Sequence, residues 1–135
     1  MLLTFKRESF VQEIIEGTKI HTLRPDPNDR WKPHMKIHFW KGNPRNVKQN
    51  PYFFGNGIVF ETPRLHLYDD AIEFIHMPAS IYKPELRGKE LDRFARNDGF
   101  KDWKAMKLWF PGIHKNMKLI FWSDFEFKIP PTSAH

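Results

Sequence analysis

The sequence predicts a single α+β domain, built on a small curved sheet or barrel of five to six short strands with flanking helices early and late in the chain. The length of 135 residues is close to that of one ordinary domain. Aromatic residues make up 16% of the chain, and such large apolar rings favour folding around a core. Short stretches of alternating apolar and polar residues, separated by turn residues, are typical of strands.

The first half of the chain is expected to contain one helix and most of the strands. Residues 2–5 form a short strand candidate, and residues 8–16 place apolar side chains at helical spacing before Gly17, which favours a helix end. Residues 41–57 are rich in Asn, Pro and Gly, which predicts a long loop or an extended hairpin. Alternation predicts further strands over residues 19–24, 34–40, 58–62 and 64–68.

The second half is expected to contain two helices and the closing strands. One helix is predicted over residues 85–97, and a second follows Asp102, a suitable N-cap, with Trp103, Met106 and Phe110 on its core side. Closing strands are predicted over 117–122 and 125–129. Residues 1–130 are therefore expected to form the domain, and residues 131–135 a C-terminal tail.

Composition limits the class of protein. Without cysteine there is neither a disulfide scaffold nor a thiolate metal site, which suits a reducing compartment. No apolar run approaches the roughly 18 residues that span a bilayer, and the N-terminus lacks the features of a signal peptide. We therefore expect a cytoplasmic protein that does not contact a membrane, with a monomer favoured.

The net charge of +6 is concentrated in two tracts. Residues 30–60 carry six basic residues and no acidic one, and residues 103–123 carry four lysines and no acid. Aromatic residues interrupt both tracts, a composition typical of surfaces that bind nucleic acid. The alternative is that these charges only keep an aromatic-rich domain soluble. Within the first tract the candidate RNA-binding residues are Lys36, Trp40, Lys41, Arg45 and Tyr52, whereas Phe39 is expected in the core.

The segment from Gly17 to Arg24 is the densest cluster of reactive side chains. Lys19 offers an amine, Thr22 a hydroxyl and Arg24 a planar guanidinium. On a regular strand Thr22 and Arg24 share one face and Lys19 lies on the other. All three can therefore meet only if Lys19 lies on the turn or at a bulge.

The pattern Gly-x-Lys-x-x-Thr-x-Arg, after a short strand and an amphipathic helix, resembles the signature of the ASCH family, whose fold is similar to the PUA RNA-binding domain. The later segment Asn97-Asp98-Gly99-Phe100, before an aromatic-rich helix, resembles a second block of that family. The resemblance implies a small PUA-like β-barrel and a cleft that binds RNA or a nucleotide-like molecule. It also implies an alternative, because one branch of the family hydrolyses the amide of N4-acetylcytidine. In that branch Lys19, Thr22 and Asp98 would be the catalytic residues, although the branch has glutamate where this chain has Asp98.

Four interpretations follow for this cluster. The preferred one is recognition of RNA or a nucleotide, in which Lys19, Thr22 and Arg24 hold polar or anionic groups. The second is a metal-free amidohydrolase acting on an acylated nucleoside. In it Thr22 is the nucleophile, Lys19 is the base, and Asp98 orients the amine or protonates the leaving group. In the third there is no site, because Lys19 and Arg24 are solvated and Thr22 only packs. A protein-interaction module with an exposed apolar patch is the fourth.

No metal or other cofactor is expected. His34 and His38 would share a strand face, but Lys36 lies between them and would repel a cation.

Overall fold

The structure, a computed structural model, describes residues 1–75 and 80–128. Its three helices are α1 (Glu8–Glu16), α2 (Lys89–Asn97) and α3 (Trp103–Trp109), and a short 3-10 turn spans Val47–Gln49. The strands are β1 (Leu2–Phe5), β2 (His21–Arg24), β3 (Lys36–Lys41), β4 (Tyr52–Glu61), β5 (Arg64–Leu67), β6 (Ile72–Ile75), β7 (Glu85–Leu86) and β8 (His114–Phe127).

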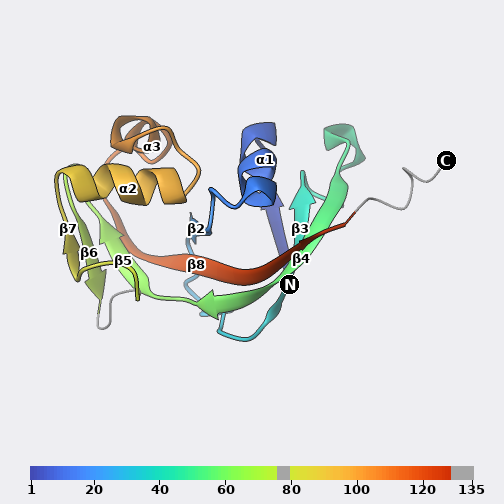
Figure 1. The fold of residues 1–135 in the computed structure, drawn as a ribbon, viewed down its shortest axis with the longest axis horizontal. Helices are drawn as coiled ribbons and strands as arrows, with labels where there is room; N and C mark the ends of the chain where they lie inside the picture. The colour runs from blue at the N-terminus through green and yellow to red at the C-terminus, as the bar shows by residue number, and fades with distance from the viewer. Residues whose placement is uncertain (76–79, 129–135) are drawn as a thin grey trace.

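Strand β8 is the central element of the sheet, and it is visible as the long curved band in Figure 1. It pairs antiparallel with β4, β5 and β2, so three segments of the first half of the chain are hydrogen-bonded to the last strand. The strand order is β1-β3-β4-β8-β5-β6-β7, with β2 paired to β8 outside this path. Within β2, Thr22 lies opposite Ile120, and Arg24 lies opposite Lys118.

The α+β class is confirmed, but the number of strands predicted is wrong: the described residues form eight, not five or six. Strands β6 and β7 were not predicted. Strand β4 begins inside residues 41–57, expected to form a long loop or an extended hairpin, and its antiparallel pairing with β3 agrees with the hairpin. Among the described residues, β1 and β7 are the two ends of the strand order and do not pair with each other, so the sheet is open.

Two boundaries also differ from the sequence-based expectation. The helix expected from residue 85 begins at Lys89, because Glu85 and Leu86 pair with β6 instead. The two closing strands form one continuous strand, β8, because it pairs in turn with β5, β2 and β4 along its length. Residues 129–135, which include the end of the last predicted strand and the predicted tail, lie outside the described residues.

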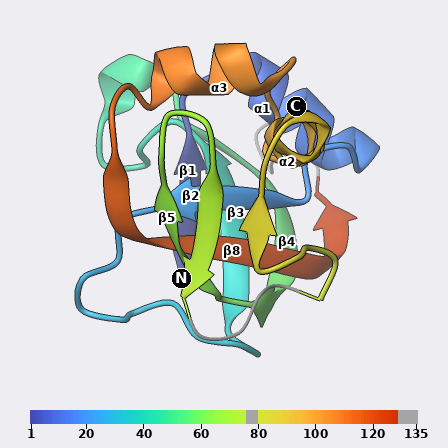
Figure 2. The ribbon, with the colours of Figure 1, turned by 90° about the vertical axis from the view of Figure 1, so that its left-hand side faces the viewer.

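All three helices lie along the same side of the sheet, at the top of both Figure 1 and Figure 2. Their apolar faces supply Phe10, Val11, Ile14, Phe94 and Met106 to the core. Phe39 is fully buried, as predicted. None of the helices in residues 1–75 and 80–128 has the length and apolar character needed to cross a bilayer.

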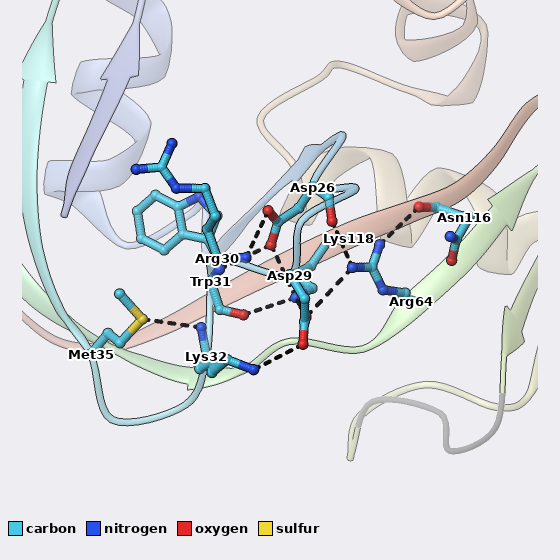
Figure 3. Close-up of polar contacts among 9 residues, drawn as sticks. All are labelled: Asp26, Asp29, Arg30, Trp31, Lys32, Met35, Arg64, Asn116 and Lys118. Atoms are coloured by element: carbon cyan, nitrogen blue, oxygen red, sulfur yellow. Dashed lines mark hydrogen bonds and ion pairs between the residues drawn. The ribbon is translucent and has the colours of Figure 1, made fainter.

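Lys118 lies on β8, opposite Arg24, and is almost completely buried. Figure 3 shows its polar contacts. Its Nζ lies 3.0 Å from Asp26 Oδ2, donates a hydrogen bond to the Trp31 carbonyl at 2.9 Å and contacts the Asp29 carboxylate. Asp26 also accepts from the backbone N–H groups of Arg30 and Trp31, both at 2.9 Å. These bonds attach the loop after β2 to the centre of the sheet.

The electrostatics of this cluster stabilise the charged forms of both carboxylates. Burial by itself would raise the pKa of Asp26, but the N–H groups of Trp31 and Arg30 and the Lys118 ammonium together hold this pKa below its ordinary value. Hydrogen bonds from Lys118 and Lys32 hold the pKa of Asp29 well below its usual range. The ion pairs therefore contribute stability above about pH 4, the titration range of an unfolded aspartate, and that contribution is lost as the pH falls through the lower folded values.

Replacing Lys118 by methionine is expected to destabilise the fold by about 3–5 kcal/mol at pH 7, because the Asp26 carboxylate would remain buried without its counter-charge. The loss should be smaller at pH 3, where the carboxyl group can protonate. Urea unfolding at both pH values measures this. Lys115→Met, an exposed position on the same strand, is the control. Equal stability of Lys118→Met and the unmodified protein at pH 7 would contradict this description of the cluster.

Candidate functional site

The turn between α1 and β2 places Lys19. Gly17 ends α1 with φ of +84°, a left-handed conformation that glycine adopts without strain. The N–H groups of Thr18 and Lys19 both donate to the Glu13 carbonyl, at 2.9 and 3.0 Å. Strand β2 begins only at His21, so Lys19 lies on the turn. This is the condition under which Lys19, Thr22 and Arg24 can meet.

The end of α2 lies beside this turn. The Ile20 N–H donates to the Asn97 carbonyl at 2.9 Å, which places the next residue, Asp98, against the turn. Gly99 follows with φ of +93°, and a Cβ atom there would lie 2.8 Å from both Glu13 Oε2 and Lys19 Cδ. Only glycine therefore permits this approach of the two segments.

Lys19, Thr22, Arg24 and Asp98 line one pocket of about 270 Å³, here called the Lys19 pocket. Its walls are mainly aromatic and comprise Phe5, Phe10, Phe100, Trp109 and Phe110. Lys6 lies at the rim, where its side chain is exposed. The pocket thus combines a few polar groups with ring surfaces, as small-molecule sites usually do.

Lys19 is 1% exposed, so its ammonium depends on protein groups for hydrogen bonds. Nζ donates to the His21 carbonyl at 2.8 Å and to the Asp98 carbonyl, and it lies 3.8 Å from Asp98 Oδ1. It also lies over the Phe10 ring, 4.9 Å from the centroid. Burial lowers the pKa of Lys19 to about 8, against the opposing effect of Asp98.

A buried chain of hydrogen bonds leads from Asp98 away from the pocket. His21 Nδ1 is 2.8 Å from Asp98 Oδ1, His21 Nε2 is 2.6 Å from the Tyr82 hydroxyl, and Asn97 Nδ2 donates to that hydroxyl at 2.9 Å. Because a carboxylate can only accept, Nδ1 carries the proton and Nε2 accepts from Tyr82. Burial lowers the pKa of His21 and raises that of Tyr82, so both groups are neutral in this chain.

Arg24 and Thr22 line the pocket from strand β2. Arg24 donates to the Thr4 carbonyl at 2.5 Å and lies 5.1 Å from the centroid of the Phe5 ring. Its Nε is 3.5 Å from Thr22 Oγ1, a long contact. Both Thr22 and Lys19 are described residues, and no hydrogen bond joins Thr22 Oγ1 to Lys19 Nζ.

The other predicted binding residues do not line the Lys19 pocket. Lys36 lines a different hollow, Lys41 lines a hollow that shares Lys6 with the Lys19 pocket, and Arg45 is exposed. Trp40 packs against Phe53, and the Tyr52 hydroxyl donates to the Glu8 carboxylate at 2.8 Å. The candidate binding residues of the first basic tract therefore lie outside the pocket that the motif residues line.

Sequence reasoning missed His21, Tyr82, Trp109 and Lys6. Alternation along β2 puts His21 on the face of Leu23, which indicates a core position, but nothing local indicates its partner Tyr82, 61 residues away. Trp109 is 46% exposed beside Phe10 and Phe100 and lies at the edge of the pocket, where α3 ends. Within residues 1–75 and 80–128, no group of three or more His, Asp or Glu side chains is arranged to hold a metal ion.

Comparison with known proteins gives no relative. No protein-family model matches the chain, and neither a curated protein nor a solved structure matches it. The geometry of the Lys19 pocket is therefore the basis for assigning a function.

Replacing Gly99 by alanine is expected to destabilise the fold more than replacing Gly112, which has φ of +77° and open space around it. Both variants place a Cβ atom in the left-handed region, at a cost of roughly 1–2 kcal/mol. Only Gly99→Ala also forces Lys19, Glu13 and Phe10 apart, which adds about 1–3 kcal/mol. Denaturant unfolding measures the difference, and equal losses in the two variants would show that the segments are not in close contact.

Proposed function

We propose that this chain recognises RNA or a nucleotide, and that one unpaired base enters the Lys19 pocket. The observation that carries the proposal is the pocket lining: Lys19, Thr22, Arg24 and Asp98 face the same hollow whose walls are aromatic rings. A planar heterocycle stacks on such rings while its edge exchanges hydrogen bonds with the polar groups.

The charges around the pocket support an anionic ligand. Lys6 lies at the rim, and Arg7 places its guanidinium 5.6 Å from the ring centroid of Trp109. Burial lowers the pKa of Arg24, yet a guanidinium stays protonated, and Arg24 has more N–H groups than its two protein partners use. A phosphate or ribose outside the pocket would therefore meet donors on both sides.

The fold supports the same class of function. The ASCH-like motif residues Lys19, Thr22 and Arg24 lie together, and the curved sheet around β8 is consistent with an opened variant of a PUA-like barrel. Membership of that family remains part of the proposal.

A second candidate function is hydrolysis of an acylated nucleoside. The observation that favours it is the buried Lys19, whose pKa of about 8 leaves a fraction of the amine neutral near pH 7. In this reaction Thr22 Oγ1 would attack the amide carbonyl and give its proton to Lys19, which would pass it to the leaving amine, and water would then hydrolyse the acyl-threonine. Against it, Lys19 Nζ donates to two carbonyls and is not hydrogen-bonded to Thr22. Binding without catalysis is therefore the preferred function.

Trp109→Ala is expected to weaken binding of a fluorescein-labelled single-stranded RNA by roughly 5- to 100-fold, because a stacking ring is lost. Trp40→Ala should leave the affinity unchanged, since Trp40 lies outside the pocket. Fluorescence anisotropy at several salt concentrations measures both affinities, and log Kd should rise linearly with log salt concentration. Leu108→Ala, at an exposed neighbour of Trp109, is the control. Loss of binding in Trp40→Ala alone would place the RNA on the basic hairpin and contradict the proposed site.

The hydrolase alternative predicts acetate release from N4-acetylcytidine. The rate should rise with pH and level off above about pH 8, because the neutral form of Lys19 is the base. Lys19→Met and Thr22→Val should each lower the rate by about 100-fold or more, whereas Lys104→Met, at an exposed position on α3, should not. Activity retained in both pocket variants, or no acetate release by the unmodified protein, would exclude this alternative.

A further inference from the structure

Asp98 presents one unused carboxylate oxygen to the Lys19 pocket. The residue is 2% exposed, and Oδ1 is held by His21 at 2.8 Å. Among the described residues, no hydrogen bond reaches Asp98 Oδ2. The only fully buried side-chain N or O atom without a partner in these residues is Glu13 Oε2, so Oδ2 is not fully enclosed by protein atoms. Within the described residues, Oδ2 is therefore the carboxylate oxygen of Asp98 that remains for a ligand in the pocket that Asp98 lines.

The hydrogen-bond chain behind Asp98 fixes the direction of this oxygen. His21 lies between the rings of Phe94 and Phe121, each with its centroid 4.8 Å away, so its ring cannot turn freely. Tyr82 stacks on Phe74 at 5.9 Å and donates to His21 Nε2. His21 donates through Nδ1 and accepts through Nε2, and the Tyr82 hydroxyl donates to His21 and accepts from Asn97. Both side chains therefore have a donor and an acceptor partner within the protein.

The remaining polar groups of the pocket are mainly donors. Lys19 has three N–H bonds and donates two of them to backbone carbonyls, while Arg24 has five and uses two. Asp98 Oδ2 is thus a strong acceptor within a set of donors. A ligand that satisfies both must offer an N–H group to Asp98 and acceptor atoms to Arg24 or Lys19.

We propose that the Lys19 pocket selects bases with an exocyclic amino group, which donates to Asp98 Oδ2, and that His21, Tyr82 and Asn97 are positioning residues that hold this oxygen in place. A carboxylate accepting from a base amine is a known form of direct readout. This inference rests on the proposed nucleotide-binding function, and it adds the class of base and the residue that selects it.

The test compares nucleotide pairs that differ only in the amine. Isothermal titration calorimetry measures the affinity of AMP against purine riboside 5′-monophosphate, and of CMP against pyrimidin-2-one riboside 5′-monophosphate. At least one amine-bearing nucleotide should bind roughly 10- to 100-fold more tightly than its analogue, the range expected for a hydrogen bond to a charged group. Equal affinity within both pairs would overturn the inference and leave nucleotide binding intact. No measurable binding of any of the four would overturn both.

Asp98→Asn provides the sharper variant. The His21 Nδ1–H would hold the amide oxygen, so the amide nitrogen, a donor, would face the pocket in place of Oδ2. The preference for the amine-bearing nucleotide should disappear, and affinity should shift towards its oxo counterpart, inosine 5′-monophosphate for AMP or UMP for CMP, whose carbonyl oxygen accepts where the amine donates. An unchanged preference for the amine-bearing nucleotide in a folded Asp98→Asn variant would overturn the role of Asp98.

Tyr82→Phe tests the positioning residues. It removes the hydroxyl that donates to His21 while keeping the ring that packs on Phe74. The ratio of affinities within the selective pair should fall by about threefold or more, with little change for the analogue that lacks the amine. A purely structural role would weaken both ligands equally and would contradict the assignment. Tyr68→Phe, a half-buried tyrosine outside the pocket, is the matched control.

Discussion

Burial of the Lys19 ammonium is the constraint on which the rest of the site depends. An amine that is 1% exposed must find its hydrogen bonds within the protein, and here they come from the His21 carbonyl and the Asp98 carbonyl. The first belongs to the start of β2 and the second to the end of α2, segments 77 residues apart. The bonds that satisfy the lysine therefore also bring together the two sides of the pocket. Asp98 supplies the nearby negative charge, and His21 holds that charge in place.

A second buried lysine shows why only one of the two forms a candidate site. Lys118 is as deeply buried as Lys19, but its Nζ contacts two carboxylates and a carbonyl, and it lines none of the pockets described above. Its charge is fully compensated, so its role is to attach the loop after β2 to the sheet. Among the described residues, the nearest carboxylate oxygen to Lys19 Nζ is 3.8 Å away, and one of its N–H groups has no partner. Incomplete satisfaction beside a cavity, and not burial alone, distinguishes a group available to a ligand from one that only stabilises the fold.

The sequence predicted those features that local chemistry determines. The helix end at Gly17 and the alternation in β2 were enough to predict that Lys19 must lie on the turn before β2 if it is to meet Thr22 and Arg24. The alternation of aromatic residues was enough to predict that Phe39 lies in the core. Asp98 was predicted as a site residue only through the resemblance to a family motif. Partnerships across the chain were not accessible, because nothing near His21 indicates Tyr82 and nothing near Lys118 indicates Asp26. The short strands β6 and β7 were missed for a similar reason, since two to four residues carry too little periodicity and pairing alone defines them.

The protonation of the His21 ring tests most directly whether the buried network is arranged as described. Long-range ¹H–¹⁵N NMR distinguishes the two neutral tautomers from the imidazolium ion. At pH 7 the ring should be neutral, with the proton on Nδ1 towards Asp98 and with Nε2 accepting from Tyr82. Because burial lowers the pKa of His21, this neutral form should persist as the pH falls below the ordinary titration range of histidine. A proton on Nε2, or a charged ring at pH 7, would contradict this arrangement of Asp98 and with it the geometry assigned to the pocket.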